Sequence, residues 1–138
     1  MSERKVKVLL TTAIEGEDTV TASYDGLLRV LARGVSLTYT ENTEGAVTTT
    51  RLLIERERMS LLRSGAVSFR TVYEVGKPCR SAYRLGGMAF DALTETECLT
   101  VLLGMALPAV DCVYRLTLGG ETRHFSLSLR LSESGVKA

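Results

Sequence analysis

The stretch from Val113 to Ser132 constrains the fold more than any other, because it predicts a β-hairpin in which both the strands and the turn are specified. On either side of Gly119-Gly120, apolar and polar residues alternate with the period of strands that are wet on one face. A two-residue hairpin turn needs positive φ at its central positions, which glycine adopts without a steric clash. Two strands cannot bury an apolar face by themselves, so this hairpin requires a larger sheet.

Most of the remaining chain supplies further short strands, each followed by turn-forming residues. The predicted turns are Glu15 to Asp18, Asp25-Gly26, Glu41 to Gly45, Ser64-Gly65, Gly76 to Pro78 and Gly86-Gly87. Residues 28–40 are read as one strand with a turn-compatible glycine inside it, and residues 96–107 lose the period, so that helix and strand both remain open there. About eight to ten strands in a chain of this size favour a closed barrel or a two-layer sandwich. We favour an all-β, antiparallel closed barrel, because closure removes exposed strand edges.

Length and composition limit the classes of protein. A chain of 138 residues suits one domain, predicted here as 1–138. With 17 basic and 16 acidic side chains, the net charge of +1 gives no general attraction to nucleic acid or to an anionic membrane. The first residues lack the pattern of a signal peptide, and no apolar run approaches the roughly 20 residues that span a bilayer. The three separated cysteines suit reduced thiols, so we expect a cytoplasmic protein.

The order of several short motifs resembles a known family. The motifs are Tyr24-Asp25-Gly26, Leu37 to Glu41, Leu62 to Gly65, Tyr83 to Gly87, Thr94 and Tyr114-Arg115-Leu116. In this order they resemble the YwiB-like family of bacterial proteins, a domain of unknown function with a calycin-like barrel. The resemblance covers nearly the whole chain and implies an up-and-down antiparallel barrel of lipocalin type. Because the family has no established activity, it brings no catalytic residues.

The residues show no arrangement typical of catalysis or metal binding. His124 is the only histidine, and the hairpin alternation places it with Ser126 on the solvated face, where a surface role is expected. Its separation from the cysteines excludes the spacing of a zinc site, so no metal and no cofactor are predicted. Carboxylate pairs such as Glu95 with Glu97 are typical of exposed strand ends. The glycine pairs are hairpin turns and do not open a helix as a phosphate loop would.

One pair of charged residues is predicted to lie inside the barrel. Glu41 follows the alternation of Leu37 and Tyr39, and Arg63 follows that of Leu61, so both would lie at or within the barrel mouth. An unpaired charge there is costly, and we expect the two to pair. The candidate interior residues are Tyr39, Glu41, Arg63, Tyr83, Thr94 and Tyr114. These polar groups could plug the barrel or line a small pocket for one ligand.

Three functions are compatible with this pattern. The first is a non-catalytic barrel that binds a small, partly apolar molecule, which predicts a continuous cavity touching Tyr39, Glu41, Arg63 and Tyr83. The second is a filled barrel that meets another protein, with a second copy of itself as one option, so monomer and homodimer both remain open. An enzyme is third, since it would have to work without histidine through Glu41, Arg63 and the tyrosines.

Overall fold

The protein is all-β in the part that the structure describes. A computed structural model describes residues 3–104 and 106–134, so residues 1–2, 105 and 135–138 of the predicted domain lie outside it. The strands are β1 (Glu3–Ile14), β2 (Val20–Val30), β3 (Gly34–Thr43), β4 (Ala46–Glu55), β5 (Met59–Gly65), β6 (Val67–Tyr73), β7 (Cys79–Leu85), β8 (Met88–Leu102), β9 (Ala109–Leu118) and β10 (Glu121–Glu133). The described residues contain no helix long and apolar enough to cross a membrane.

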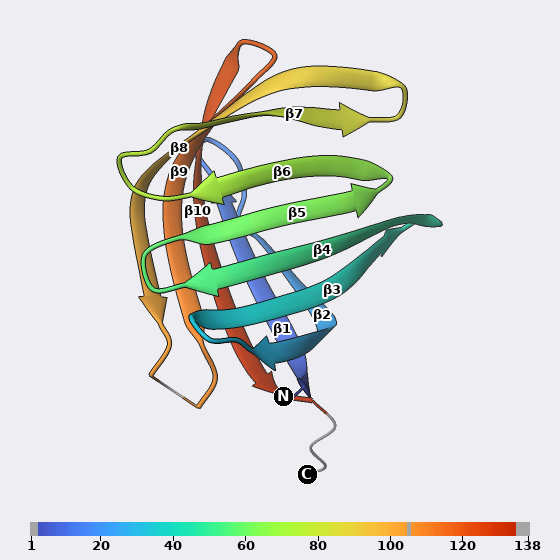
Figure 1. Cartoon of the computed structure of the whole chain (residues 1–138). Coiled ribbons are helices and arrows are strands. Elements are labelled where there is room, and N and C mark those ends of the chain that lie inside the picture. Colours follow the sequence, from blue (N-terminus) through green and yellow to red (C-terminus); the bar gives the residue numbers. More distant parts are fainter. Residues whose placement is uncertain (1–2, 105, 135–138) are drawn as a thin grey trace.

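The strands form a closed barrel in which each strand pairs with the next one along the chain. β1 pairs with β10 and closes the circle, with Val8 opposite Leu131. Figure 1 shows β3 to β6 as a meander that runs across β1, β9 and β10. The predicted up-and-down antiparallel barrel is therefore confirmed, with ten strands.

The C-terminal hairpin has the predicted geometry. Leu118 pairs with Glu121, so Gly119-Gly120 is a two-residue turn, and its φ values are 59° and 89°. Gly86-Gly87 forms a turn of the same length between Leu85 and Met88. Because turn length fixes the register of each hairpin, these glycines also decide which side chains point inward.

The inward face forms one apolar core, as the alternation predicted. Val6 and Val8 on β1 are fully buried and so is Leu37 on β3, whereas Lys5 and Lys7 lie on the exposed face. The buried cluster consists of Val6, Val8, Leu28, Val35, Leu37, Tyr39, Leu52, Ile54, Met59, Tyr73, Val110, Cys112, Tyr114 and Leu129. These side chains come from every strand except β7 and β8, so the core lies mainly against the β1–β6 and β9–β10 walls.

The predicted turn Asp25-Gly26 lies inside a strand, and the predicted turn Ser64-Gly65 is the end of β5, paired with β4. β2 runs without a break through Asp25-Gly26, because Gly26 occupies a strand position where a Cβ atom would lie 2.9 Å from Val8 Cγ2. A glycine can mark such a close approach as well as a turn. The chain instead turns at residues 31–33, within the stretch 28–40 that was predicted as one strand.

β3 also continues further than predicted, since it ends at Thr43 and leaves Glu44-Gly45 as the turn. Glu41 is therefore a strand residue with a fixed direction. The segment that begins at residue 96, for which helix and strand were both possible, is a strand up to Leu102. A bulge between Thr96 and Cys98 interrupts its alternation of inward and outward side chains. Within the segment 96–108, Met105 lies outside the described residues.

The shortest backbone ladder in the barrel is the one between β6 and β7. Their ladder holds only the pairs Val67–Leu85, Ser68–Arg84 and Phe69–Tyr83. Beyond it, β6 reaches β8 directly, because the Thr71 hydroxyl donates a 2.7 Å hydrogen bond to the Thr94 hydroxyl. Both threonines are buried, at 0% and 1% exposure. This side-chain bond joins the two strands where the backbone ladder has stopped.

We expect Thr94→Ala to lower the free energy of unfolding by about 1–3 kcal/mol, because it leaves the buried Thr71 hydroxyl without its acceptor. The double variant Thr71→Val/Thr94→Val, which removes both hydroxyls and keeps the side-chain shape, should cost clearly less. Urea denaturation of the three proteins measures the difference. A double variant less stable than Thr94→Ala would show that the hydrogen bond is not the source of the effect.

Candidate functional site

An internal cavity of about 270 Å³ lies at one end of the barrel. Its volume is just below the 300–1,000 Å³ typical of pockets for drug-sized ligands, so it suits a smaller molecule. It is lined by Leu10, Thr12, Val20, Ala22, Tyr24, Tyr39, Glu41, Thr50, Leu52, Met59, Leu61, Arg63, Tyr73, Tyr114 and Leu127. Val20 is 61% exposed, so the cavity reaches solvent beside the start of β2.

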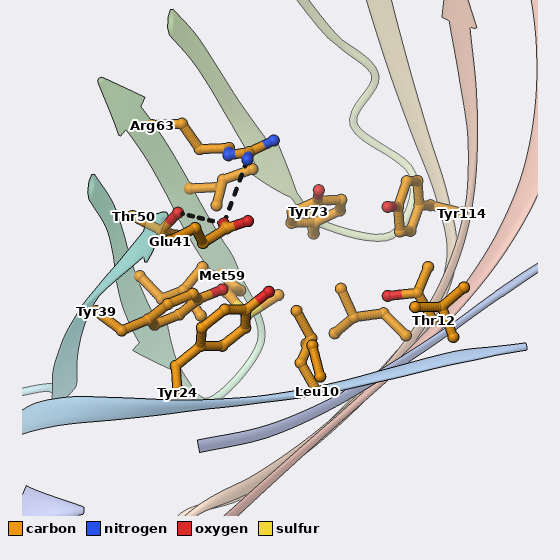
Figure 2. A pocket seen from close by; sticks show the side chains of 15 residues that line it. Leu10, Thr12, Tyr24, Tyr39, Glu41, Thr50, Met59, Arg63, Tyr73 and Tyr114 are labelled. Atoms are coloured by element: carbon orange, nitrogen blue, oxygen red, sulfur yellow. Dashed lines mark hydrogen bonds and ion pairs between the residues drawn. The ribbon is translucent and has the colours of Figure 1, made fainter. Parts of the chain in front are cut away.

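The lining is divided into an apolar wall and a polar wall. Leucines from β1, β4, β5 and β10 and the buried Met59 form the apolar side. Figure 2 shows the hydroxyls of Tyr24, Tyr39 and Tyr73 directed into the same space as the carboxylate of Glu41 and the guanidinium of Arg63. A concave, mostly apolar site with a few convergent polar groups is the usual form of a small-molecule site.

Glu41 and Arg63 form the expected pair at the polar wall. Arg63 Nη2 donates to Glu41 Oε2 at 3.2 Å, and the Thr50 hydroxyl donates to the same oxygen at 3.2 Å. Both charged side chains are only 25% exposed. The pair satisfies part of each group, but Arg63 Nε is buried and has no hydrogen-bond partner among the described residues.

Tyr24 and Tyr39 stack beside this pair, with ring centroids 4.8 Å apart and an angle of 18° between the rings. Burial, followed by the negative charge of Glu41, raises the pKa of both phenols above the usual 10.0. Because the phenols stay neutral, each keeps its proton and remains able to donate a hydrogen bond.

Tyr73 and Tyr114 form the opposite side of the polar wall, with ring centroids 4.8 Å apart. Burial raises the pKa of Tyr114 to about 12, and it raises the pKa of Tyr73 well above the usual 10.0, with Tyr114 adding to the effect. Tyr114 also stacks on Phe125 at 5.0 Å, which fixes its ring against β10. The cavity is therefore bordered by phenol groups that stay neutral over the physiological pH range.

The structure brings four of the six predicted interior residues to the cavity: Tyr39, Glu41, Arg63 and Tyr114. Tyr83 packs against Phe69 at a centroid distance of 5.2 Å and does not line the cavity. Thr94 lies in the contact between β6 and β8, bonded to Thr71. The expected continuous cavity thus touches three of the four residues named for it, because Tyr83 lies further toward the β7–β8 hairpin.

The sequence prediction missed Tyr24, Tyr73 and Thr50. Alternation was the available signal for Tyr24 and Tyr73. Tyr24 shares a face with Ala22 once β2 is read through Gly26, and Tyr73 shares a face with Phe69. Thr50 lies directly between Tyr39 and Arg63 in the cross-strand pairing, which requires the register and not only the period.

His124 lies outside the barrel, on the outer face as expected. Its Nε2 is 3.0 Å from Glu97 Oε2 and its Nδ1 is 3.4 Å from Glu15 Oε1, with the side chain 41% exposed. The hydrogen bond to Glu97, and the charges of Glu97 and Glu15, raise its pKa above the usual 6.5. This group is separated from the cavity by the barrel wall.

A group whose folded pKa is raised stabilises the fold fully below its unfolded pKa. The contribution of His124 should therefore be present below pH 6.5 and be lost as the pH rises through the higher folded pKa. Because the chain has one histidine, a single imidazole C2–H resonance reports the titration by NMR. Stability of His124→Gln should change less with pH over the same range. An imidazole that titrates at or below 6.5 in the folded protein would contradict the expectation.

The described residues contain no group of three or more His, Cys, Asp or Glu side chains placed to hold a metal ion. The three cysteines are free thiols: Cys98 is exposed, Cys79 is half-buried, and burial raises the pKa of Cys112 to about 12. The polar groups of the cavity can donate, accept and hold charge in a pair, and these are the interactions that orient an organic ligand.

Fold and cavity together define a closed ten-stranded antiparallel barrel with a small, mostly apolar interior site that has one polar wall. Among barrels of this class, the chain belongs to the family described as a domain of unknown function (DUF1934), which matches residues 6–130. The crystal structure of the ywiB protein from Bacillus subtilis is similar, with a TM-score of 0.81 and 16% sequence identity over 94% of this chain and 93% of that one. The resemblance to YwiB-like proteins is thus confirmed, and the likeness shows a shared fold. Among curated proteins, none matches the chain.

Proposed function

We propose that this protein is a non-catalytic binding protein that holds one small, partly apolar molecule inside the barrel. The observation that carries the proposal is the cavity of about 270 Å³, in which leucines face a converging set of phenols and one ion pair. A barrel whose polar residues served only as a plug would pack them against one another without such a space. The rival function, a filled barrel that only meets other proteins, leaves this cavity without a role.

The absence of catalysis is part of the proposal and rests on how the acid and the base are placed. Glu41 Oε2 already accepts hydrogen bonds from Arg63 and Thr50, so this oxygen is held in the protein's own contacts. His124, the one imidazole of the chain, lies on the outer face with Glu97. The cavity phenols are neutral, and the carboxylate that faces the Thr50 hydroxyl is itself paired with Arg63.

Native mass spectrometry of freshly purified protein tests the proposal. We expect a fraction of the protein to carry a single added mass, which disappears on denaturation and is recovered in the organic extract. The same experiment reports whether the protein is a monomer or a homodimer. A protein that carries no molecule and also gains no stability from any member of a small-fragment library would contradict ligand binding.

A further inference from the structure

The ion pair in the cavity restricts the kind of polar group that an occupant can carry. Glu41 and Arg63 sum to zero net charge, and both are three-quarters buried. A ligand with a net charge would bring one uncompensated charge into a small and mostly apolar space, which is costly. The pair therefore favours an uncharged occupant.

Arg63 has hydrogen-bond donors to spare on its Nη groups, which face the cavity (Figure 2), whereas Nε is also unpartnered among the described residues but is buried out of a ligand's reach. A guanidinium carries five N–H donors, and the structure gives a single bond from Arg63, to Glu41. A partly buried donor without an acceptor costs free energy that a ligand acceptor would recover. An occupant should therefore present an acceptor, such as a carbonyl oxygen, to Arg63.

Glu41 can take a donor at the same place. It accepts from Thr50 and from Arg63 through Oε2, and the Tyr24 phenol lies within hydrogen-bonding reach, which still leaves free some of the about four lone-pair sites of an ionised carboxylate. The polar head of the occupant thus meets a donor and an acceptor side by side. Planar groups with a carbonyl next to an N–H match this arrangement, as amides, lactams and ureides do.

The rest of the cavity favours a ligand whose remaining part, beyond the polar group, is a flat aromatic ring. Tyr24 and Tyr39 are stacked near Glu41, and Tyr73 and Tyr114 face them across the space (Figure 2). Aromatic rings pack well against other rings, in stacked or edge-to-face geometry. The limited volume of about 270 Å³ allows one small ring system of this kind.

We infer that the occupant is a small, uncharged, planar molecule in which an amide-type donor–acceptor head meets the Glu41–Arg63 pair and an aromatic body lies among the tyrosines and leucines. This inference rests on the proposed function and adds the ligand class. It concerns recognition only and involves no covalent step.

Three probes with the same ring and different charge test the inference: benzamide, benzoate and benzylamine. We expect benzamide to bind at least about tenfold more tightly than either charged probe, as followed by titration of ¹⁵N-labelled protein by NMR. Resonances of the cavity residues should report the shift. Benzoate or benzylamine binding as tightly as benzamide would overturn the inference.

If the Glu41–Arg63 pair determines the preference for an uncharged probe, two variants should each favour a charged probe. Glu41→Gln leaves Arg63 without its carboxylate and should improve benzoate binding at least about tenfold. Arg63→Gln leaves Glu41 negative and should improve benzylamine binding by a similar factor. Arg70→Gln, the same change at an exposed position on the outer face of β6, should leave all three affinities unchanged. Thermal unfolding verifies that each variant folds, and the wild-type order of the probes stands as a test without them.

The outcomes separate this inference from the proposed function. If none of the probes binds but the purified protein retains another molecule, the ligand class is wrong and the binding function stands. If the probes do not bind, no fragment stabilises the protein and nothing is retained, both fail. Affinities that stay in the wild-type order in Glu41→Gln and Arg63→Gln show that the pair does not select the occupant.

Discussion

Replacing Gly34 with alanine should destabilise the barrel by about 3 kcal/mol or more, because the added methyl group meets the backbone of the paired strand. Gly34 is the first residue of β3 and pairs with Glu55 at the end of β4. A Cβ atom there would lie 2.0 Å from the carbonyl oxygen of Ile54 and 3.0 Å from its carbonyl carbon. These atoms belong to the backbone of the paired strand, so no side-chain rotation relieves the clash.

Either β3 or β4 would have to move to relieve the clash, and contacts on each strand oppose that movement. The Ile54 side chain is fully buried, and the Gly34 carbonyl accepts a 2.8 Å hydrogen bond from the Leu31 amide in the preceding turn. Gly87→Ala is the matched control, because nothing lies within 4 Å of a Cβ at that hairpin glycine. Urea denaturation should show a strongly reduced midpoint for Gly34→Ala and a change within about 0.5 kcal/mol for Gly87→Ala. Equal midpoints would mean that β3 and β4 separate easily at this end.

The behaviour of the glycines also shows how far the fold could be predicted from the sequence. Gly119-Gly120 was read correctly, because alternating strands of the right length flank the pair and only a hairpin accommodates both. Gly26 was read as a turn because it follows an aspartate, yet it lies within β2 under Val8. A glycine required for space and a glycine required for φ look the same in a sequence, and only the packed neighbour distinguishes them.

The sequence predicted which face of the barrel wall each site residue occupies, but not how far along the barrel axis it lies. Period two assigns a side chain to the inner or the outer face, which is why Glu41 and Arg63 were placed inside together. It does not give the height along the barrel axis, which depends on strand register and tilt. Tyr83 and Thr94 accordingly point inward but lie away from the cavity, Tyr83 against Phe69 and Thr94 against β6.

The second large effect that we expect is the loss of ligand retention in Ala22→Trp. Ala22 lies on β2 between Val20 and Tyr24, lines the cavity, and has the smallest side chain among its lining residues. An indole at this position would extend across the opening toward Leu10, its neighbour on β1, and occupy space that a ligand needs. The mouth reaches solvent beside Val20, so the new ring enters an open space and should cost the fold little.

Ser23→Trp is the control, because it places the same indole one residue away on the exposed outer face of β2. Organic extracts of the wild type, Ala22→Trp and Ser23→Trp proteins, prepared in parallel and compared by liquid chromatography and mass spectrometry, measure retention. We expect the bound molecule in the first and third extracts and a reduction of at least about 100-fold in the second, since a filled site removes the contacts on which the affinity depends. Equal recovery from all three proteins would place the molecule on the outside of the barrel, because the only difference between the two variants is the face of β2 that carries the indole.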